Sequence, residues 1–304
     1  MKLAIFTDEI GWHTRQLQAA LRARGAVGRC VDLADCHVDT NASPHGLSIP
    51  GFGRELPHAA IVRGIAAGTF EQVTKRLGIL HALRELGVTV YNDARSIERS
   101  VDKSMTSMLL KAAGVPAPAT WATESYSVAQ RIVTRESAAG RTLVLKPLFG
   151  SQGKGLEQIG LVDGVHRPLP PLAQIAGRLC YLQRFIPPQG APGFDWRVLV
   201  VGGRAVAAMR RVSDHWIHNV AQGARCEPAT PNGELRRIAE SAAWALEMDY
   251  AGVDLIASKQ GIQVLEVNGV AAWRGLQQVT PFNIAEVLVA DVLRKASRRR
   301  SARA

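Results

Sequence analysis

Apolar residues along the first ninety positions alternate between two periods. Short apolar runs have the length of buried strands, and between them apolar residues recur at the spacing of a helix face. Each helical stretch stops at a glycine, Gly25 or Gly87, a residue that commonly ends a helix. Strands that alternate with helices predict a small parallel α/β domain. The expected strands are 2–6, 27–33, 59–63 and 88–91, and the expected helices are 14–24 and 69–86.

After residue 91 the pattern changes to pairs of strands. The strongest hairpin signal surrounds Gly202 and Gly203, because two apolar runs flank this two-residue turn. Prolines and glycines fill 187–193, where we expect a joint between domains. The expected strands are 140–147, 160–167, 181–186, 195–201 and 204–211, with a hairpin at 252–268, and the expected helices are 97–113, 232–246 and 284–295.

These patterns divide the chain into three units and a tail. A length of 304 residues leaves room for two or three domains. The predicted fold class is α/β with α+β character, because a parallel α/β part precedes a part built from strand pairs. The predicted units are an N-terminal α/β domain at 1–91, a central subdomain at 92–186, a C-terminal subdomain at 187–296 and a basic, disordered tail at 297–304.

Composition places the chain among ordinary soluble globular proteins. Hydrophobic residues make up 47% and charged residues 21% of the sequence. No apolar run approaches the roughly 20 residues that span a bilayer, and the first apolar run is too short for a signal peptide. The four cysteines are scattered without a metal-ligand spacing. We therefore expect a cytoplasmic protein with reduced thiols and no membrane association.

The formal net charge of +11 attracts anions such as nucleotides, polycarboxylates or nucleic acids. Part of this excess lies in 293–304, LRKASRRRSARA. A solvated tail explains the run more simply than a nucleic-acid arm, because no zinc-finger spacing, RNP motif or heptad array accompanies it. We therefore do not expect nucleic acid among the partners.

The segment 252–268, GVDLIASKQGIQVLEVN, places three oxygen donors on one predicted hairpin. Glu266 and Asn268 are two residues apart in a strand, so their side chains share a face, and Asp254 joins that face if the register allows. Two carboxylates and an amide oxygen suit Mg²⁺ or Mn²⁺. The same residues also fit a solvated hairpin edge with incidental acids, and the spacing alone does not decide between the two.

A glycine-rich segment, 150–155 (GSQGKG), follows directly after a predicted strand that bears Lys146. Glycines let backbone N–H groups surround phosphate oxygens, and Ser151 and Lys154 add donors and charge. The segment is not a Walker A loop, because Lys154 is followed by another glycine. For the loop alone, a mobile turn without a ligand is the alternative. Together with Lys103 upstream, however, two lysines and such a loop indicate a polyphosphate.

Charged residues also line the predicted hairpin at 195–211. Asp195 and Arg197 share a strand face, and Arg210 and Arg211 lie on the partner strand. Arginine is the preferred donor to carboxylate and phosphate, because its planar fork bonds bidentately. The pattern fits either the stabilisation of a charged intermediate or cross-strand salt bridges, which contribute little on a surface.

Three other kinds of site find no support in the motifs. The sequence has no GxSxG elbow for Ser/His/Asp hydrolysis, and no HExxH motif or paired cysteines for zinc chemistry. The first domain lacks the GxGxxG fingerprint of dinucleotide binding. His215 and His218 lie close in sequence to Arg211, and their roles stay open.

The order of the motifs resembles that of the ATP-grasp superfamily. Within it, the chain is similar to the RimK-like α-L-glutamate ligases, which include the ribosomal protein S6 modification enzyme and amino-acid ligases of cofactor biosynthesis. The likeness runs from 92 to the closing helix and implies an ATP-grasp fold with a central lid subdomain and a C-terminal antiparallel-sheet catalytic subdomain. The motifs are DK at 102–103, LVLKP at 143–147, GSQGKG at 150–155, YLQRFI at 181–186, DWRVLVVG at 195–202, AAMRR at 207–211, HNVAQGA at 218–224, AGVD at 251–254 and VLEVN at 264–268.

The resemblance implies ATP-dependent formation of an amide bond. ATP phosphorylates a carboxylate, and an amine then attacks the acyl phosphate. Arg197 and Arg211 would stabilise the acyl phosphate and its tetrahedral adduct, and two Mg²⁺ or Mn²⁺ ions would bridge the phosphates. The implied nucleotide-binding residues are Lys103, Lys146, Gly150, Ser151, Gln152, Gly153, Gly155, Gln183, Arg184, Phe185, Ile186 and Asp195, and the implied metal ligands are Asp254, Glu266 and Asn268.

The chain departs from the family pattern in two places near the nucleotide. Arg184 stands where the family commonly has Glu in the adenine strand, so only backbone contacts to adenine carry over there. Before Asn219, the family often has a basic residue followed by Thr or Ser, and here Ile217 and His218 take those positions. His218 either supplies a substitute donor or the phosphate contact is lost.

Our first hypothesis is a ligase that adds L-glutamate, or another amino acid, to an anionic acceptor carboxylate. The acceptor could be a pterin or furan cofactor precursor of the tetrahydromethanopterin type, a small peptide or a protein tail. Trp273 and Arg274 could line a pocket for a ring, with simple packing of Trp273 as the alternative. Other hypotheses are a D-alanine–D-alanine or glutathione synthetase-like ligase, or a nucleotide- or nucleic-acid-binding protein without catalysis. Relatives of this kind imply a homo-oligomer.

Overall fold

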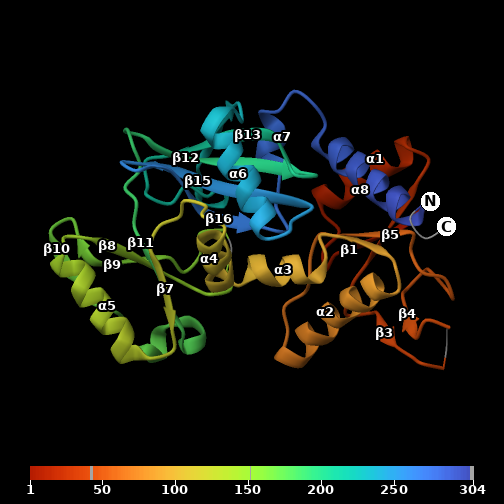
Figure 1. Cartoon of the computed structure of the whole chain (residues 1–304), viewed down its shortest axis with the longest axis horizontal. Helices are drawn as coiled ribbons and strands as arrows, with labels where there is room; N and C mark the ends of the chain where they lie inside the picture. Colours follow the sequence, from red (N-terminus) through yellow and green to blue (C-terminus); the bar gives the residue numbers. More distant parts are fainter. Residues whose placement is uncertain (42–43, 151, 302–304) are drawn as a thin grey trace.

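The structure is a computed structural model that describes residues 1–41, 44–150 and 152–301. In Figure 1 the N-terminal sheet lies at the right, the central sheet at the left, and the C-terminal sheet above the middle. The N-terminal sheet is parallel, and the central and C-terminal sheets are antiparallel. This confirms the predicted α/β class with α+β character.

The N-terminal sheet has the strand order β2-β1-β5-β6. Alternation along β1 separates two packing faces: Leu3 and Ile5 pack with α1 and α8, and Ala4 and Phe6 pack with α2. Every strand and helix predicted for this domain is present. The elements are β1 Lys2–Phe6, α1 Trp12–Ala23, β2 Val27–Val31, β5 Ala59–Val62, α2 Phe70–Glu85 and β6 Thr89–Tyr91, with a small pair β3 His37–Val38 and β4 Leu47–Ser48.

The central sheet has the strand order β10-β9-β8-β11-β7 and packs against α5. The sequence pattern did not predict β7 or α5. The helix α5 begins after Ser125, whose side chain accepts a hydrogen bond from the N–H of Val128, and it buries Ala129, Ile132 and Val133. The elements are β7 Thr120–Thr123, α5 Tyr126–Ala138, β8 Thr142–Lys146, β9 Glu157–Val162, β10 Val165–Arg167 and β11 Cys180–Arg184, with 3-10 turns at Leu172–Gln174 and Ala176–Arg178.

The C-terminal sheet has the strand order β14-β13-β12-β15-β16, and α6 covers one face. The other face is apolar at the end next to the N-terminal domain, where Leu199 and Val201 are buried, and charged at the opposite end of β12, at Asp195 and Arg197. The elements are β12 Gly193–Val201, β13 Arg204–Ser213, β14 Arg225–Ala229, α6 Gly233–Ala245, β15 Tyr250–Ser258, β16 Gly261–Asn268 and α7 Arg274–Gln278, with a 3-10 turn at Val220–Gln222.

One predicted helix is in fact two. Asp102 has extended backbone angles, and its carboxylate accepts hydrogen bonds from the N–H groups of Ser104 (2.8 Å) and Met105 (3.1 Å). Such a cap satisfies N–H groups that have no partner inside the helix, so a new helix begins here. The break makes Lys103 the first residue of the second helix, which directs it to the site described below. The two helices are α3 Ala94–Val101 and α4 Lys103–Ala112.

The closing helix α8, Ile284–Ser301, is longer than predicted. It continues into the segment 297–304 that we expected to be a disordered tail, and 302–304 lie outside the described residues. In Figure 1, α8 lies beside α1, and both pack on the N-terminal sheet. The last helix therefore returns to the first domain and joins it to the C-terminal subdomain.

Asn92 ties the end of the N-terminal domain to the β15–β16 pair. Its side chain is fully buried, and its Nδ2 donates to the carbonyl oxygens of Tyr250 and Gly269, both at 2.7 Å. Its Oδ1 accepts from the N–H groups of Asp249 (2.6 Å) and Tyr250 (3.1 Å). One amide thus satisfies four backbone groups next to the strands that carry the acidic residues.

Asn92→Ala should leave these backbone groups buried without partners, so we expect a loss of about 2–4 kcal/mol in the free energy of unfolding, measured with urea at pH 7. Asn232→Ala is the matched control. Asn232 is exposed and its side chain makes no cap bond to α6, so its removal should change the free energy by less than about 0.5 kcal/mol. Equal small changes in both variants would contradict the structural role of Asn92.

Candidate active site

A cleft between the central and C-terminal sheets collects most of the predicted site residues. Its walls come from α4, β8, β11, β12, β13, β15 and β16 and from the loops that follow them. Gly155, Arg197 and Asn268 do not belong to its lining, and Ser151 lies outside the described residues. The predicted residues that line the cleft are Lys103, Lys146, Gly150, Gln152, Gly153, Gln183, Arg184, Phe185, Ile186, Asp195, Arg211, Asp254 and Glu266.

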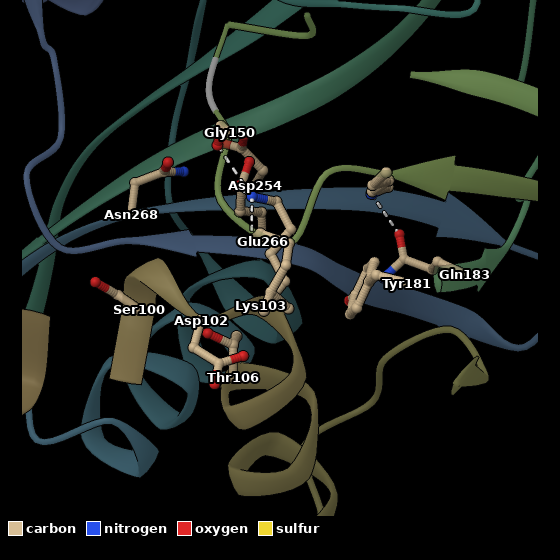
Figure 2. Close-up of polar contacts among 12 residues, drawn as sticks. Ser100, Asp102, Lys103, Thr106, Gly150, Tyr181, Gln183, Asp254, Glu266 and Asn268 are labelled. Carbon is tan, nitrogen blue, oxygen red and sulfur yellow. Dashed lines mark hydrogen bonds and ion pairs between the residues drawn. The ribbon is translucent and has the colours of Figure 1, made fainter. Parts of the chain in front are cut away.

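The strands β15 and β16 form the predicted hairpin and settle its register. Asp254 lies directly opposite Glu266, and Gly252 lies opposite Asn268. Directly opposed residues in an antiparallel pair share a face, so Asp254, Glu266 and Asn268 all belong to one face. Figure 2 shows these three side chains on the neighbouring strands above α4. The register that the sequence left open is therefore the one that groups the oxygen donors.

A β-bulge lies beside the two carboxylates. Pairing shifts from Asp254 opposite Glu266 to Leu255 opposite Val264, so Leu265 has no partner on β15. A bulge bends its strand and redirects the side chains next to it. Both Leu265 and Glu266 consequently line the cleft, although neighbours in a regular strand point to opposite faces.

Asp254 lies inside a buried network of two acids and two arginines. Arg197 donates from Nε and Nη2 to the two oxygens of Asp254, the second bond at 2.8 Å, and Arg211 Nη2 lies 3.0 Å from Asp254 Oδ2. Arg211 also forms two bonds with Asp195, at 2.7 and 2.6 Å. The cross-strand salt bridges considered from the sequence are therefore present. Those of Arg197 and Arg211 are largely buried, whereas Arg210 pairs with Glu227 at the surface.

Burial and charge act differently on the two acids. Burial by itself raises the pKa of a carboxyl group, but the charges and hydrogen bonds of Arg197 and Arg211 hold the pKa of Asp254 below its usual value. Burial raises the pKa of Asp195 to about 6, because Arg211 is shared with Asp254 and offsets only part of the desolvation. Asp254 is thus the acid that stays ionised across the widest pH range.

Lys103 reaches from the start of α4 into the cleft. Its Nζ donates to the carbonyl oxygens of Gly150 (2.9 Å) and Leu148 (3.3 Å) and lies 3.6 Å from Glu266 Oε1. Figure 2 shows this side chain between the loop at Gly150 and the strand of Glu266. The lysine therefore joins the glycine-rich loop to the acidic strand.

Lys146 is the last residue of β8 and points into the same cleft. Its Nζ donates to Gln183 Oε1 on β11 at 2.6 Å. Burial lowers the pKa of Lys146, an effect that Glu266 opposes and Lys103 reinforces. The two lysines and Glu266 are therefore close enough to influence one another electrostatically.

The glycine-rich loop packs against the segment 217–222. A side chain at Gly153, which has φ of +71°, would meet Asn219 Oδ1 at 2.7 Å and Ile217 Cγ2 at 2.8 Å. Gln222 Nε2 also donates to the carbonyl oxygen of Gln152 at 3.2 Å. Gly153 is thus required both by its backbone conformation and by the close approach of the two segments. Gln222 belongs to the motif HNVAQGA at 218–224, but the sequence alone predicted no role for it.

The side chain of Arg184 binds a residue of α5, so it does not replace the Glu that the family pattern has in the adenine strand. It donates to Glu136 Oε2 on α5 at 3.1 and 2.7 Å, and Glu136 is 2% exposed. The N–H groups of Arg184 and Phe185 donate to Ala119 O and Thr142 O, so nucleotide contacts would use other backbone groups of 183–186. Arg184 is therefore committed to the packing of the central sheet on α5.

All four residues of the 216–219 segment line the cleft. Trp216 meets Phe185 edge to face, with ring centroids 5.9 Å apart. His218 is buried, its Nδ1 lies 3.8 Å from Asp195 Oδ2, and its Nε2 has no hydrogen-bond partner among the described residues. Burial, followed by the charge of Arg211, lowers the pKa of His218 to about 4. Sequence reasoning did not single out Trp216.

Trp273 packs in the core rather than lining the cleft. It is 1% exposed, its ring lies 4.6 Å from the guanidinium carbon of Arg63, and its backbone N–H donates to His13 Nε2 at 3.0 Å. The packing alternative is therefore the correct one for Trp273. Arg274 follows at the start of α7 and is exposed.

Two family models cover nearly the whole chain. Residues 1–97 match the RimK PreATP-grasp domain, and residues 100–292 match the RimK-like ATP-grasp domain. The chain belongs to the RimK-like ATP-grasp family. The fold and family that the motif order indicated are confirmed.

Named relatives of this RimK-like protein are glutamate ligases. The tetrahydromethanopterin:alpha-L-glutamate ligase of Methanosarcina acetivorans is 31% identical over 93% of this chain and 95% of its own. That of Methanocaldococcus jannaschii is 35% identical over 68% of this chain and 70% of its own. A probable alpha-L-glutamate ligase of Legionella pneumophila is 29% identical over 97% of this chain and 96% of its own.

Solved structures share the fold at lower identity. The ATP-grasp ligase PsnB, complexed with minimal precursor, Mg and ADP, has a TM-score of 0.70 at 20% identity and covers 97% of this chain and 98% of its own. A RimK domain protein ATP-grasp from Sphaerobacter thermophilus has a TM-score of 0.70 at 21% identity and covers 96% of this chain and 100% of its own.

Membership of the family gives the general activity. The RimK-like protein is an ATP-dependent ligase that forms an amide bond. In the described part of the chain, no helix has both the length and the apolar character needed to cross a bilayer.

The neutral imidazole of His218 makes stability depend on pH. Its folded pKa of about 4 lies below the ordinary 6.5, so between these values the unfolded chain binds more protons. Its contribution is intact above pH 6.5 and is lost as the pH falls towards 4, by up to about 1.4 kcal/mol per pH unit. We expect the free energy of unfolding, measured with urea from pH 7 to 4.5, to fall less steeply in His218→Gln than in the wild type.

His215→Gln is the control, because His215 is in the same loop but exposed and should leave the pH dependence unchanged. The pKa of His13 is also lowered to about 4, by burial and then by Arg63 and Arg274, so the His218 variant should keep part of the slope. Equal slopes in wild type and His218→Gln would show that His218 is not the buried neutral group described here.

Proposed function

We propose that this ligase adds L-glutamate to a carboxylate of an anionic acceptor through an acyl phosphate. The observation that carries the proposal is the cleft itself, in which Asp254 and Glu266 share one sheet face beside Lys103, Lys146 and the arginine network. This combination suits a polyphosphate and a carboxylate substrate together. The relatives named as glutamate ligases over almost their full length support glutamate as the amine.

The acidic strand has the donors that a divalent cation needs. Asp254 and Glu266 supply carboxylate oxygens, and Asn268 donates its Nδ2 to Gly252 O at 3.3 Å, which leaves its Oδ1 for a cation. We propose that these residues hold Mg²⁺ or Mn²⁺, two ions in the full complex. When bound, the metal would supply positive charge next to the nucleotide phosphates. The PsnB structure contains Mg and ADP, which supports Mg²⁺ as the cation.

The nucleotide roles follow the sides of the cleft. Lys103 and Lys146 hold the phosphates. Each lysine would give up its hydrogen bond to a neutral oxygen, Gly150 O or Gln183 Oε1, and bind a charged phosphate oxygen instead. The described glycines of 150–155 surround the phosphates, and 183–186 meets adenine through backbone groups. Asp195 lies at the edge of this site and fixes Arg211.

In the reaction, an oxygen of the acceptor carboxylate attacks the γ-phosphorus of ATP, and ADP leaves. The neutral amine of glutamate attacks the carbon of the acyl phosphate, the C–O bond to phosphate breaks, and the proton that the amine loses leaves with the phosphate as the amide forms. Arg197 and Arg211 act on charge alone, because they bind the oxygens on which negative charge develops. Neither arginine moves a proton.

We propose an acceptor of the small, anionic, ring-containing kind, since the relatives include tetrahydromethanopterin ligases and the chain is basic. Peptide precursors in the PsnB complexes make an acidic peptide the second candidate. The cytoplasmic location, the homo-oligomer and the boundaries 1–91, 92–186 and 187–296 also stay proposals. A glutathione synthetase-like choice of substrates is the alternative within the fold.

The proposal predicts acceptor-dependent release of ADP by the purified protein with Mg²⁺, ATP and L-glutamate. The panel of acceptors contains pterin carboxylates and acidic peptides, and mass spectrometry should show a product heavier by one glutamyl unit. Glu266→Gln should reduce turnover by at least about 100-fold, because it removes one charged ligand of the metal. Product formation with another amino acid but not with glutamate would contradict the choice of amine.

Deletion of 299–304 tests whether the basic end has a role of its own. The deletion spares Ala296, which is buried against the N-terminal domain. A ligase should keep its turnover and its salt dependence, whereas a nucleic-acid-binding protein should lose salt-sensitive affinity for DNA or RNA. Loss of turnover after this deletion would contradict the view of this segment as a solvated end.

A further inference from the structure

The cations of the active site are already bound to acceptors within the protein. The two lysines donate to carbonyl and amide oxygens, and Arg211 donates to both oxygens of Asp195. Arg197 differs from them because both of its side-chain hydrogen bonds are to Asp254, a proposed metal ligand, whereas Lys103 and Arg211 contact Glu266 and Asp254 in addition to other acceptors. The carboxylate of Asp254 would therefore have to neutralise both Arg197 and the metal ion, and these two positive charges repel each other.

The contact between Arg197 and Asp254 occupies both carboxylate oxygens. Arg197 Nε donates to Oδ1 and Nη2 donates to Oδ2, and Arg211 lies 3.0 Å from Oδ2 as well. Asp254 is 3% exposed, so the charges are little screened by water. A divalent cation that binds Asp254 in this state meets a fixed positive charge on each oxygen.

Of the two arginines, only Arg197 depends on Asp254 for its neutralisation. Arg211 keeps two bonds to Asp195 if Asp254 turns to a metal. Among the described residues, Arg197 has an ion pair with Asp254 alone. Its side chain is also the more exposed of the two, at 12% against 4%. Arg197 is therefore the arginine that can be released.

Arg197 lies outside the lining of the nucleotide cleft, although Asp254 is part of it. A Cβ on Gly252 would lie 3.2 Å from both Cδ and Nη1 of Arg197 and 2.9 Å from the side chain of Ala271. Gly252 thus leaves the space that the arginine uses. This places Arg197 near Ala271, in the segment that follows Asn268 and outside the lining of the cleft.

We propose that Arg197 is a built-in counter-ion of Asp254, that a divalent cation displaces it, and that the freed guanidinium then binds the acceptor carboxylate. The inference rests on the proposed function, which makes Asp254 a metal ligand. Charge stays balanced in the exchange, because Asp254 gains the cation and Arg197 gains a substrate carboxylate. The metal and nucleotide therefore bind before the acceptor, and Arg197 sets that order.

The test is the affinity of the nucleotide-free protein for Mn²⁺, followed by the electron paramagnetic resonance signal of free Mn²⁺. Arg197→Gln removes the competing charge, so we expect the Kd for Mn²⁺ to fall on the order of tenfold. Arg210→Gln is the matched control. Arg210 is on the same hairpin but pairs with Glu227 at 2.6 Å on the other face, so its loss should leave the Kd unchanged.

A Kd in folded Arg197→Gln that is unchanged or higher overturns the proposal, because Arg197 would then hold Asp254 in place for the metal. If that variant does not fold, Arg197→Lys decides. Lysine keeps the charge but not the paired bonds, so its Kd should fall severalfold, and a higher Kd overturns the proposal. The measurement involves no turnover. Failure of glutamate transfer by the wild type would therefore overturn the proposed function, and the change in the Kd for Mn²⁺ could still be interpreted.

Discussion

The active site depends on the mutual neutralisation of Asp195, Arg211, Asp254 and Arg197 on one face of the C-terminal sheet. Buried charges carry a large desolvation cost, and an uncompensated partner destabilises a fold by several kcal/mol. The bonds across β12, β13 and β15 satisfy this requirement and also fix the mutual position of three strands. The network therefore keeps the charges that the proposed reaction uses inside a stable sheet.

Local breaks in regular structure bring other groups to this network. The carboxylate of Asp102 ends one helix and begins the next, which brings Lys103 to the loop at Gly150 and to Glu266. The bulge in β16 turns Leu265 and Glu266 towards the same cleft. Asn92 then holds the ends of the β15–β16 pair against the first domain. The side chains of the site are thus positioned by irregularities, a helix break and a β-bulge, within otherwise regular helices and strands.

The sequence predicted what depends on local pattern, and it missed what depends on distant partners. Alternation along β15 and β16 predicted a shared face, although only the structure shows that Asp254 faces Glu266. The apolar pattern around Asp102 continues without interruption, so it did not predict the helix break, which depends on the cap that the Asp102 carboxylate forms. Arg184 could not be matched with Glu136, nor Trp273 with Arg63, because long stretches of chain separate these partners.

The most direct test of this account is a crystal structure of the protein with Mg²⁺ and a non-hydrolysable ATP analogue. The account predicts that an oxygen of Asp254 lies about 2.1 Å from Mg²⁺, that the guanidinium of Arg197 has left Asp254, and that Arg211 stays on Asp195. Mg²⁺ bound without Asp254, or Arg197 still paired with both oxygens of Asp254 while the metal and nucleotide are in place, would contradict it.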